Sequence, residues 1–393
     1  MHMDPVMVML TSAVLAILIV GFLIHRLKQP YIVAYMIVGV IIGPHGLALI
    51  SDQLDLHQIG SIGVLLLLFF IGMEMSLPRL VANWRVAVIG TLLQILISVG
   101  ILCGLGYWLD WPLAQSVLLG FVISLSSTAV IIKILQEWKE IDTDVGRDVI
   151  GILLIQDLAI VPMMISINFL GGAALNIAGL ILQIIGGLGI IALLVWVIIK
   201  GEFKMPFGQL LRKDNELQVF SAFMLCFGLA FITGIFNLSA ALGAFVAGIL
   251  ISVAKETHWV YERLEPFHVV FVAFFFVSIG MLVDLNFLQD NLMLALSLVV
   301  ISVLINTAVN AVIMRFLGEN WRDSLYGGAL LSQIGEFSFV LAGVGISAAI
   351  ITEFSYQMTI VVISLTLLLS PLWILFIKRV TLKKTNQEVW INT

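Results

Sequence analysis

Apolar segments of about twenty residues recur along the whole chain, and each can cross a hydrocarbon layer roughly 30 Å thick at about 1.5 Å per residue. Of the 393 residues, 61% are hydrophobic and 11% are charged. A soluble domain is about 45–50% apolar and about 25% charged, so this composition argues against a soluble enzyme or a nucleic-acid-binding protein. The sequence predicts an all-α integral membrane protein whose solvent is the lipid bilayer.

Polar loops divide the chain into thirteen expected spans. The first apolar run has no basic segment before it and no small-residue cleavage site after it, so we interpret it as a span rather than a signal peptide. The expected spans are 5–24, 31–50, 58–77, 86–108, 113–135, 147–169, 174–199, 217–235, 238–254, 266–285, 291–314, 324–350 and 356–377.

The distribution of charge orients these spans. All 19 Lys and Arg residues lie between the last turn of an odd-numbered span and the first residue of the next span, or in the tail after span thirteen. The loops after even-numbered spans carry acidic or neutral residues, such as Asp110 and Asp290. Because loops rich in Lys and Arg stay cytoplasmic, we expect the N-terminus outside and the C-terminus inside. The expected location is the plasma membrane, which is the inner membrane in a bacterium.

Asp157 is a carboxylate expected near the centre of the bilayer. It follows Arg147 by ten residues, so a straight helix places it about 15 Å into the membrane. A charge at that depth costs on the order of 2.5–3.5 kcal/mol, which predicts a position in a bundle interior or a water-filled cavity. Gln156 precedes it and offers a neutral oxygen beside the acid. The alternative is a carboxylate that serves helix packing alone.

Span five is interrupted by hydroxyl residues at a similar depth. Ser124, Ser126, Ser127 and Thr128 are poor helix formers, and a helix that unwinds here would expose backbone carbonyls. Such carbonyls can replace the water around a cation. The alternative is that the hydroxyls bond back to their own helix.

Span twelve carries a second polar interruption. Gln333 and Gly335 predict a break, and Glu336 is a second carboxylate that is costly at this depth. Glu336 could instead be a structural partner of a hydroxyl or backbone group. Glu74, toward the cytoplasmic end of span three, is a weaker candidate for an interfacial or structural role.

Spans five and twelve are seven apart, so they cross the membrane in opposite directions. Polar interruptions at corresponding places in two inverted halves indicate a transporter's binding site. We therefore expect one transport unit made of a first repeat (1–169), a connector span and cytoplasmic loop (170–216), a second repeat (217–377) and a cytoplasmic tail (378–393).

Several ordered stretches resemble the Kef-type branch of the monovalent cation:proton antiporter-2 family, over nearly the whole chain. They are YMIVGVIIGP at 35–44, LFFIGMEM at 68–75, SSTA at 126–129, the pair Gln156–Asp157, GAFVAGIL at 243–250, FFFVSIGMLVD at 274–284 and QIGEF at 333–337. The resemblance implies a sodium/proton antiporter-like fold, a homodimer, and two broken helices that cross at the ion site of an elevator-like core. It also implies that Asp157 binds cation and proton in turn, with Gln156 beside it, and it implies no cofactor.

Two features depart from the pattern of this family. Many relatives carry a Lys in the span that corresponds to span eleven, where the best match here is Asn306. That Lys is linked to charge balance in electrogenic members, so we expect electroneutral, one-for-one exchange. Kef proteins also carry a nucleotide-binding regulatory domain after the last span. The 393 residues leave no room for one, so we expect that it was removed, that a separate cytoplasmic subunit regulates the protein, or that this control is absent.

The resulting hypothesis is K+/H+ antiport in which the two ions compete for Asp157. The residue before that acid is often Asn or Asp in relatives that prefer sodium, so Gln156 favours potassium, with Na+/H+ antiport as the alternative. A passive gated potassium channel is a rival, although the chain has no TVGYG-type filter. A sodium-coupled symporter for organic anions would need basic groups, and no Lys or Arg is expected in the middle of the membrane.

Overall fold

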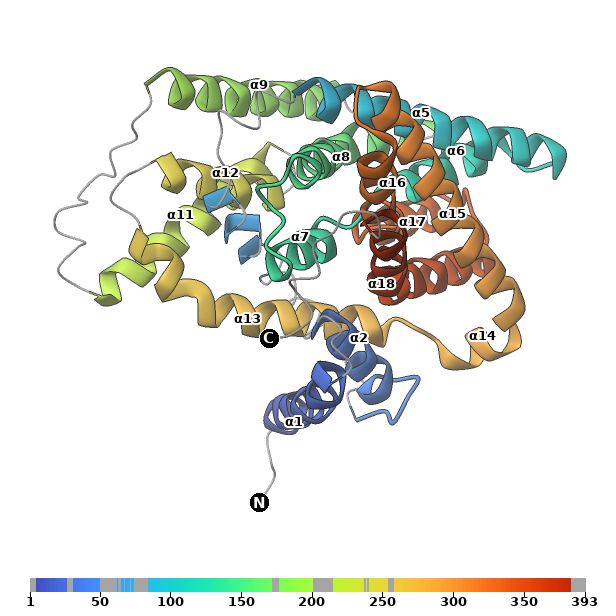
Figure 1. The fold of residues 1–393 in the computed structure, drawn as a ribbon, viewed down its shortest axis with the longest axis horizontal. Coiled ribbons are helices and arrows are strands. Elements are labelled where there is room, and N and C mark those ends of the chain that lie inside the picture. The colour runs from blue at the N-terminus through green and yellow to red at the C-terminus, as the bar shows by residue number, and fades with distance from the viewer. Residues whose placement is uncertain are drawn as a thin grey trace. The chain divides into compact units, whose positions relative to one another are not determined.

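In the computed structural model, all regular secondary structure among the described residues is α-helical (Figure 1). The structure describes residues 5–26, 31–49, 62, 65, 66, 68–70, 72, 73, 84–171, 177–200, 215–236, 238, 240–253 and 258–382. Within this part of the chain, six helices are long and apolar enough to cross a membrane, and five shorter apolar helices accompany them.

The helices follow the expected spans closely. Their bounds are α1 (Pro5–Arg26), α2 (Tyr31–Ile42), α5 (Trp84–Trp108), α6 (Leu113–Ser124), α7 (Thr128–Glu137), α8 (Asp144–Leu170), α9 (Ile177–Lys200), α11 (Asn215–Ile235), α12 (Ala240–Val253), α13 (His258–Met281), α14 (Leu285–Asp290), α15 (Leu292–Phe316), α16 (Trp321–Leu330), α17 (Phe337–Ser347) and α18 (Glu353–Leu382).

Two helix boundaries and one additional helix differ from the sequence-based expectation. Helix α2 ends at Ile42 instead of continuing to residue 50, because Pro44 lacks an N–H and disfavours helical geometry at Gly43. Helix α13 begins at His258 and passes through Pro266, where the expected span began. The short helix α14 was not expected.

The helices form two compact units, and each unit draws on both halves of the chain. The first contains α1, α2, α9, α11 to α14 and the end of α8 from Asp157. The second contains α5 to α7, α8 as far as Gln156, and α15 to α18. Each unit combines helices from both expected repeats, so the division into units differs from the division into repeats.

Pairs of glycines allow close helix packing in the first unit. A Cβ on Gly39 of α2 would lie 2.8 Å from the Cα of Gly280 in α13. A Cβ on Gly72 would lie 3.0 Å from the Cα of Gly248 in α12. Helix α2 is span two and α13 is span ten, whereas Gly72 lies in span three and α12 is span nine. In a repeat offset by seven spans, spans two and three correspond to spans nine and ten. The two glycine contacts are therefore equivalent.

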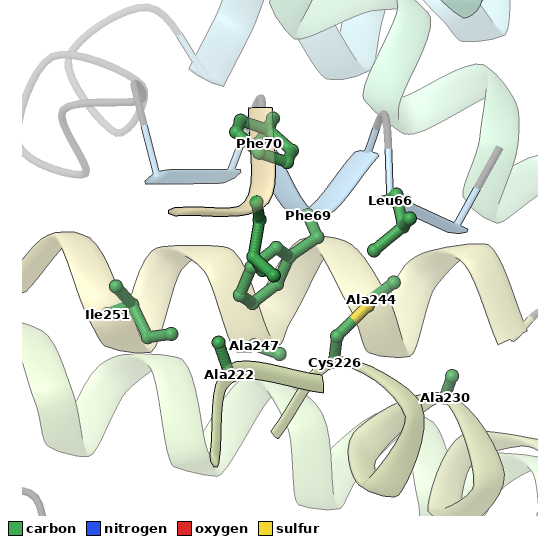
Figure 2. Close-up of a cluster of buried hydrophobic side chains, with 10 residues drawn as sticks. Leu66, Phe69, Phe70, Ala222, Cys226, Ala230, Ala244, Ala247 and Ile251 are labelled. Carbon is green, nitrogen blue, oxygen red and sulfur yellow. The ribbon is translucent and has the colours of Figure 1, made fainter. Parts of the chain in front are cut away.

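An apolar core lies beside the second of these glycine pairs. Phe69 and Phe70 are fully buried, and their rings meet edge to face with centroids 6.2 Å apart. Figure 2 shows Phe69 beside the helix that carries Ala244 and Ala247, with Cys226 on the neighbouring helix. The small side chains of α11 and α12 leave room for the two large rings, as is common between membrane helices.

The second unit has two broken helices packed against continuous ones. Helix α5 packs on α6, and α15 packs on α16, which are again equivalent pairs seven spans apart. Helix α17 packs on α6, and α18 contacts α15, α16 and α17. The expected breaks in spans five and twelve are confirmed, because α6 and α7 are separate helices and so are α16 and α17.

Candidate cation site at two crossing helix breaks

The break in span five covers residues 125–127. Leu125 has φ −91° and ψ 124°, and Ser127 has φ −79° and ψ 113°, so the backbone is extended between Ser124 and Thr128. The Ser127 hydroxyl accepts a hydrogen bond from the Val130 N–H at 3.2 Å and caps α7. The same residues that make a continuous helix unfavourable therefore begin the next one.

The break in span twelve covers residues 331–336. Helix α16 ends at Leu330, and α17 begins at Phe337 with Glu336 as its N-cap residue. Gln333 and Gly335, expected at mid-membrane depth, lie within the break and are buried, as is Ser332.

The two breaks touch through their backbones. The Gly335 N–H donates to the Leu125 carbonyl at 2.7 Å, and the Ser126 hydroxyl donates to the Leu331 carbonyl at 2.8 Å. A Cβ on Gly335 would lie 2.5 Å from the Ser126 carbonyl oxygen. Glycine is therefore required at position 335 by the closeness of the other chain.

Side chains from the second break complete the contact. The Gln333 Nε2 donates to the Ser127 carbonyl at 3.3 Å. The Glu336 carboxylate interacts with the Ser127 side chain and the Ala129 backbone amide, and so lies at the N-terminus of α7. Its Oε2 is buried without a hydrogen-bond partner among the described residues. A helix N-terminus carries partial positive charge, which favours an acidic group there. Thr128, the first residue of α7, is also buried.

Asn306 joins both breaks from helix α15. Its Nδ2 donates to the Ile123 carbonyl at 2.9 Å and to the Ser332 carbonyl at 3.2 Å. These carbonyls lie at or just beyond the C-terminal ends of α6 and α16, where helices leave acceptors unpaired. A neutral amide thus satisfies both helix ends, at the position where the family resemblance implied a Lys.

Gln156 holds the first break in place from helix α8. Its Oε1 accepts the Ser126 N–H at 2.8 Å, and its Nε2 donates to the Oε1 of Gln94 in α5 at 2.7 Å. Sequence reasoning expected the Gln156 oxygen to serve the acid beside it, whereas the structure shows this oxygen bonded to the break. Gln94 was missed, and its only signal in the sequence was an amide side chain in a mostly apolar span.

Asp157 follows Gln156 directly in α8 and is partly buried. The structure thus joins Gln156, Ser126, Ser127, Gln333, Gly335 and Asn306 in one hydrogen-bonded crossing, and the Glu336 carboxylate lies beside Ser127. Glu74 lies outside the described residues, so its role stays a prediction.

The sequence matches a family described as "Sodium/hydrogen exchanger, transmembrane" over residues 12–378. The chain belongs to this sodium/hydrogen exchanger family. Membership in the exchanger family makes the protein a multi-pass membrane protein, and the match includes both breaks together with Gln156 and Asp157.

Relatives named as transporters match most of the chain. Iron transporter MagA of Paramagnetospirillum magneticum is 37% identical over 368 residues, which are 93% of this chain and 84% of that protein. K(+) efflux antiporter 5 of Arabidopsis thaliana is 34% identical over 359 residues, which are 90% of this chain and 63% of that protein. Glutathione-regulated potassium-efflux system proteins KefC also match, so the resemblance to the Kef-type branch is confirmed. The chain spans less than two thirds of the length of K(+) efflux antiporter 5.

A solved exchanger structure has the same fold. The sodium proton antiporter MjNhaP1 from Methanocaldococcus jannaschii aligns with a TM-score of 0.67 over 97% of this chain and 99% of that one. The sequences are 19% identical, so the likeness concerns the fold. It confirms the expected sodium/proton antiporter-like architecture.

Proposed function

We propose that this exchanger-family protein is a monovalent cation/proton antiporter that exchanges K+ for H+. The observation that carries the proposal is the crossing of two unwound helices. Gln156 is hydrogen bonded to this crossing, and Asp157 is the next residue in the sequence. Unwound helix ends offer carbonyl and amide groups that can replace the water around an ion at membrane depth.

Asp157 is the residue that would couple the two ions. A carboxylate can hold either a proton or a cation on its oxygens, so binding of one excludes the other. If the core moves readily across the membrane only when Asp157 is loaded, the two ions are exchanged without leakage. An elevator-type movement is the form of alternating access that we propose.

Two features favour potassium as the cation. Gln156 occupies the position where sodium-selective relatives of the resembled family often carry Asn or Asp. K(+) efflux antiporter 5 and KefC are named for potassium efflux. The name of MagA raises iron as a rival cargo, and the name of the fold match raises sodium. All three cations therefore belong in the test.

The assembly is also part of this proposal. We propose a homodimer with its N-terminus outside and its C-terminus in the cytoplasm, made of repeats 1–169 and 217–377 around the connector 170–216. The transported ions would need no cofactor. Cysteine accessibility that places Asp110 and Arg212 on the same side would overturn this topology.

The test is exchange in liposomes that contain a pH dye. External K+, Na+, Li+ or Fe2+ is added in turn to the wild type, to Asp157→Asn and to the matched control Asp110→Asn. Asp110 is an exposed loop residue with φ 54°, a conformation that Asn also tolerates. We expect K+ to dissipate the proton gradient in the wild type and in the control, and no exchange in Asp157→Asn.

Other outcomes would replace the proposal. K+ flux without proton movement would support the passive channel. Exchange that requires Na+ would support the sodium alternative, and proton movement driven by Fe2+ alone would make iron the cargo. Full exchange by Asp157→Asn would remove that carboxylate from the mechanism.

A further inference from the structure

Thr366 of α18 holds the second break. Its Oγ1 accepts the Ile334 N–H at 3.2 Å and donates to the Ile363 carbonyl at 2.8 Å. The side chain is fully buried. A hydroxyl in a membrane helix commonly bonds back to its own helix, so the second bond, to a residue 32 positions away, requires a further explanation.

This contact has an equivalent in the first break. There the Gln156 Oε1 accepts the Ser126 N–H at 2.8 Å. Helix α8 is span six and α18 is span thirteen, so the two supporting helices are again seven spans apart. In each half, a side-chain oxygen from the following span thus holds one backbone N–H of the break.

A held N–H also fixes a carbonyl. The Ile334 N–H and the Gln333 carbonyl belong to one planar trans peptide, so they point in nearly opposite directions. Because the N–H points to Thr366, the Gln333 carbonyl points away from α18.

The two breaks differ in what that carbonyl contacts. In the first break the equivalent carbonyl, that of Leu125, accepts the Gly335 N–H at 2.7 Å. In the second, the described residues provide no hydrogen-bond donor for the Gln333 carbonyl. The Oε1 of Gln333 is likewise buried without a partner among them. Leaving such acceptors unpaired is costly at membrane depth, so these two oxygens need a partner from outside the described residues, either a bound ion or a water molecule.

We propose that Gln333 is a cation ligand, through its main-chain carbonyl and its side-chain oxygen, and that Thr366 is the residue that positions it. Both oxygens are neutral and buried, which suits a weakly hydrated monovalent cation that gives up water on binding. The inference rests on the proposed cation/proton exchange and adds a second chain segment to the site. In this inference Thr366 stays neutral throughout and acts only through its hydrogen bond to the Ile334 N–H.

The test compares Thr366→Val, Thr366→Ser and the control Thr359→Val. Val keeps the shape of Thr but cannot accept the Ile334 N–H, whereas Ser can. Thr359 lies in the same helix, and its hydroxyl donates to the Ser355 carbonyl four residues earlier. Exchange in liposomes gives KM and kcat for K+, and thermal stabilisation by K+ in detergent reports binding without transport.

We expect Thr366→Val to raise the KM for K+ about tenfold, with a matching loss of thermal stabilisation by K+, because an orphaned buried N–H no longer orients the peptide. Its kcat should stay within about twofold of the wild type. Thr366→Ser and Thr359→Val should behave as the wild type. Wild-type KM in Thr366→Val, or an effect on kcat alone, would overturn the positioning role.

A second variant tests the ligand itself. Gln333→Leu removes the side-chain oxygen, and we expect K+ to stabilise this protein much less than it stabilises the wild type. Unchanged stabilisation by K+ would overturn the ligand assignment, even if Thr366→Val fails to fold. A wild type that neither exchanges nor binds K+ would instead contradict the proposed function, so the two failures are distinguishable.

Discussion

The Gly335 N–H and the Leu125 carbonyl oxygen, 210 positions apart in the sequence, meet at 2.7 Å where the two broken helices cross. Through this bond, a carbonyl of the first break pairs with an N–H of the second break that its own helix does not satisfy. It depends on a close approach, because a Cβ on Gly335 would lie 2.5 Å from the Ser126 carbonyl oxygen.

We therefore predict that Gly335→Ala strongly reduces exchange. The added methyl must push the breaks apart, and such overpacking typically costs about 1–3 kcal/mol. Gly343→Ala in α17 is the matched control, since no atom lies within 4 Å of its added Cβ. Thermal unfolding and liposome exchange would be measured for both, and full activity in Gly335→Ala would contradict the geometry of the crossing.

Asn306 leads to a prediction about charge movement. Its neutral amide bonds to both breaks, and no basic side chain occupies its position. We predict electroneutral exchange, so solid-supported-membrane recordings of the wild type should show no current that depends on the K+ gradient. A gradient-dependent current that disappears in Asp157→Asn would show that the exchange is electrogenic.

Asn306→Asp tests the structural part of the same interaction. The carboxylate nearly matches the amide in shape but has no N–H to donate when ionised. The Ile123 and Ser332 carbonyls would lose a donor, at a cost of about 1–3 kcal/mol each. We expect a lower unfolding temperature than that of the exposed control Asn286→Asp, and equal losses in the two variants would contradict the bridging role.

Gln94 leads to a prediction about coupling. Its Oε1 accepts from Gln156, which in turn accepts the Ser126 N–H. We predict that Gln94→Leu and Gln156→Leu each lower stability and that the double variant loses less than the sum, by about 1 kcal/mol, because both remove one shared bond. Additive losses in thermal unfolding would show that the two amides act independently.

A cluster at the end of α7 leads to a prediction about stability. One oxygen of Glu140 lies 2.6 Å from the Nζ of Lys378 in α18, and the other accepts from the Tyr326 hydroxyl in α16 at 2.5 Å. The Nζ of Lys378 also lies 4.1 Å from the centre of the Trp138 ring. One carboxylate thereby joins three parts of the second unit.

We predict that Lys378→Gln lowers the free energy of unfolding by about 1–2 kcal/mol, a moderate value because the pair is partly exposed. Arg379→Gln is the control, since the adjacent Arg379 is exposed. Equal unfolding temperatures for the two variants would show that the cluster contributes nothing measurable.

Local sequence was sufficient to predict the positions of both breaks. Ser124, Ser126, Ser127 and Thr128 are poor helix formers in an apolar span, and Gly335 directly precedes Glu336 and follows Gln333 by two positions. Each signal lies within a few residues of the feature that it produces. The boundary of α2 was predicted less well because the expectation followed hydropathy through Gly43 and Pro44, whereas backbone sterics end the helix there.

By itself, the sequence determined that this is a helical membrane protein with interrupted spans and an isolated acid at Asp157, because apolar length and helix propensity are local properties. It also predicts the orientation from its loop charges. Only the tertiary structure decided the hydrogen-bond partners of Gln156, Asn306 and Thr366. These partners lie tens to hundreds of residues away, and a buried polar group in an apolar helix does not indicate which distant backbone group it will satisfy until the helices pack.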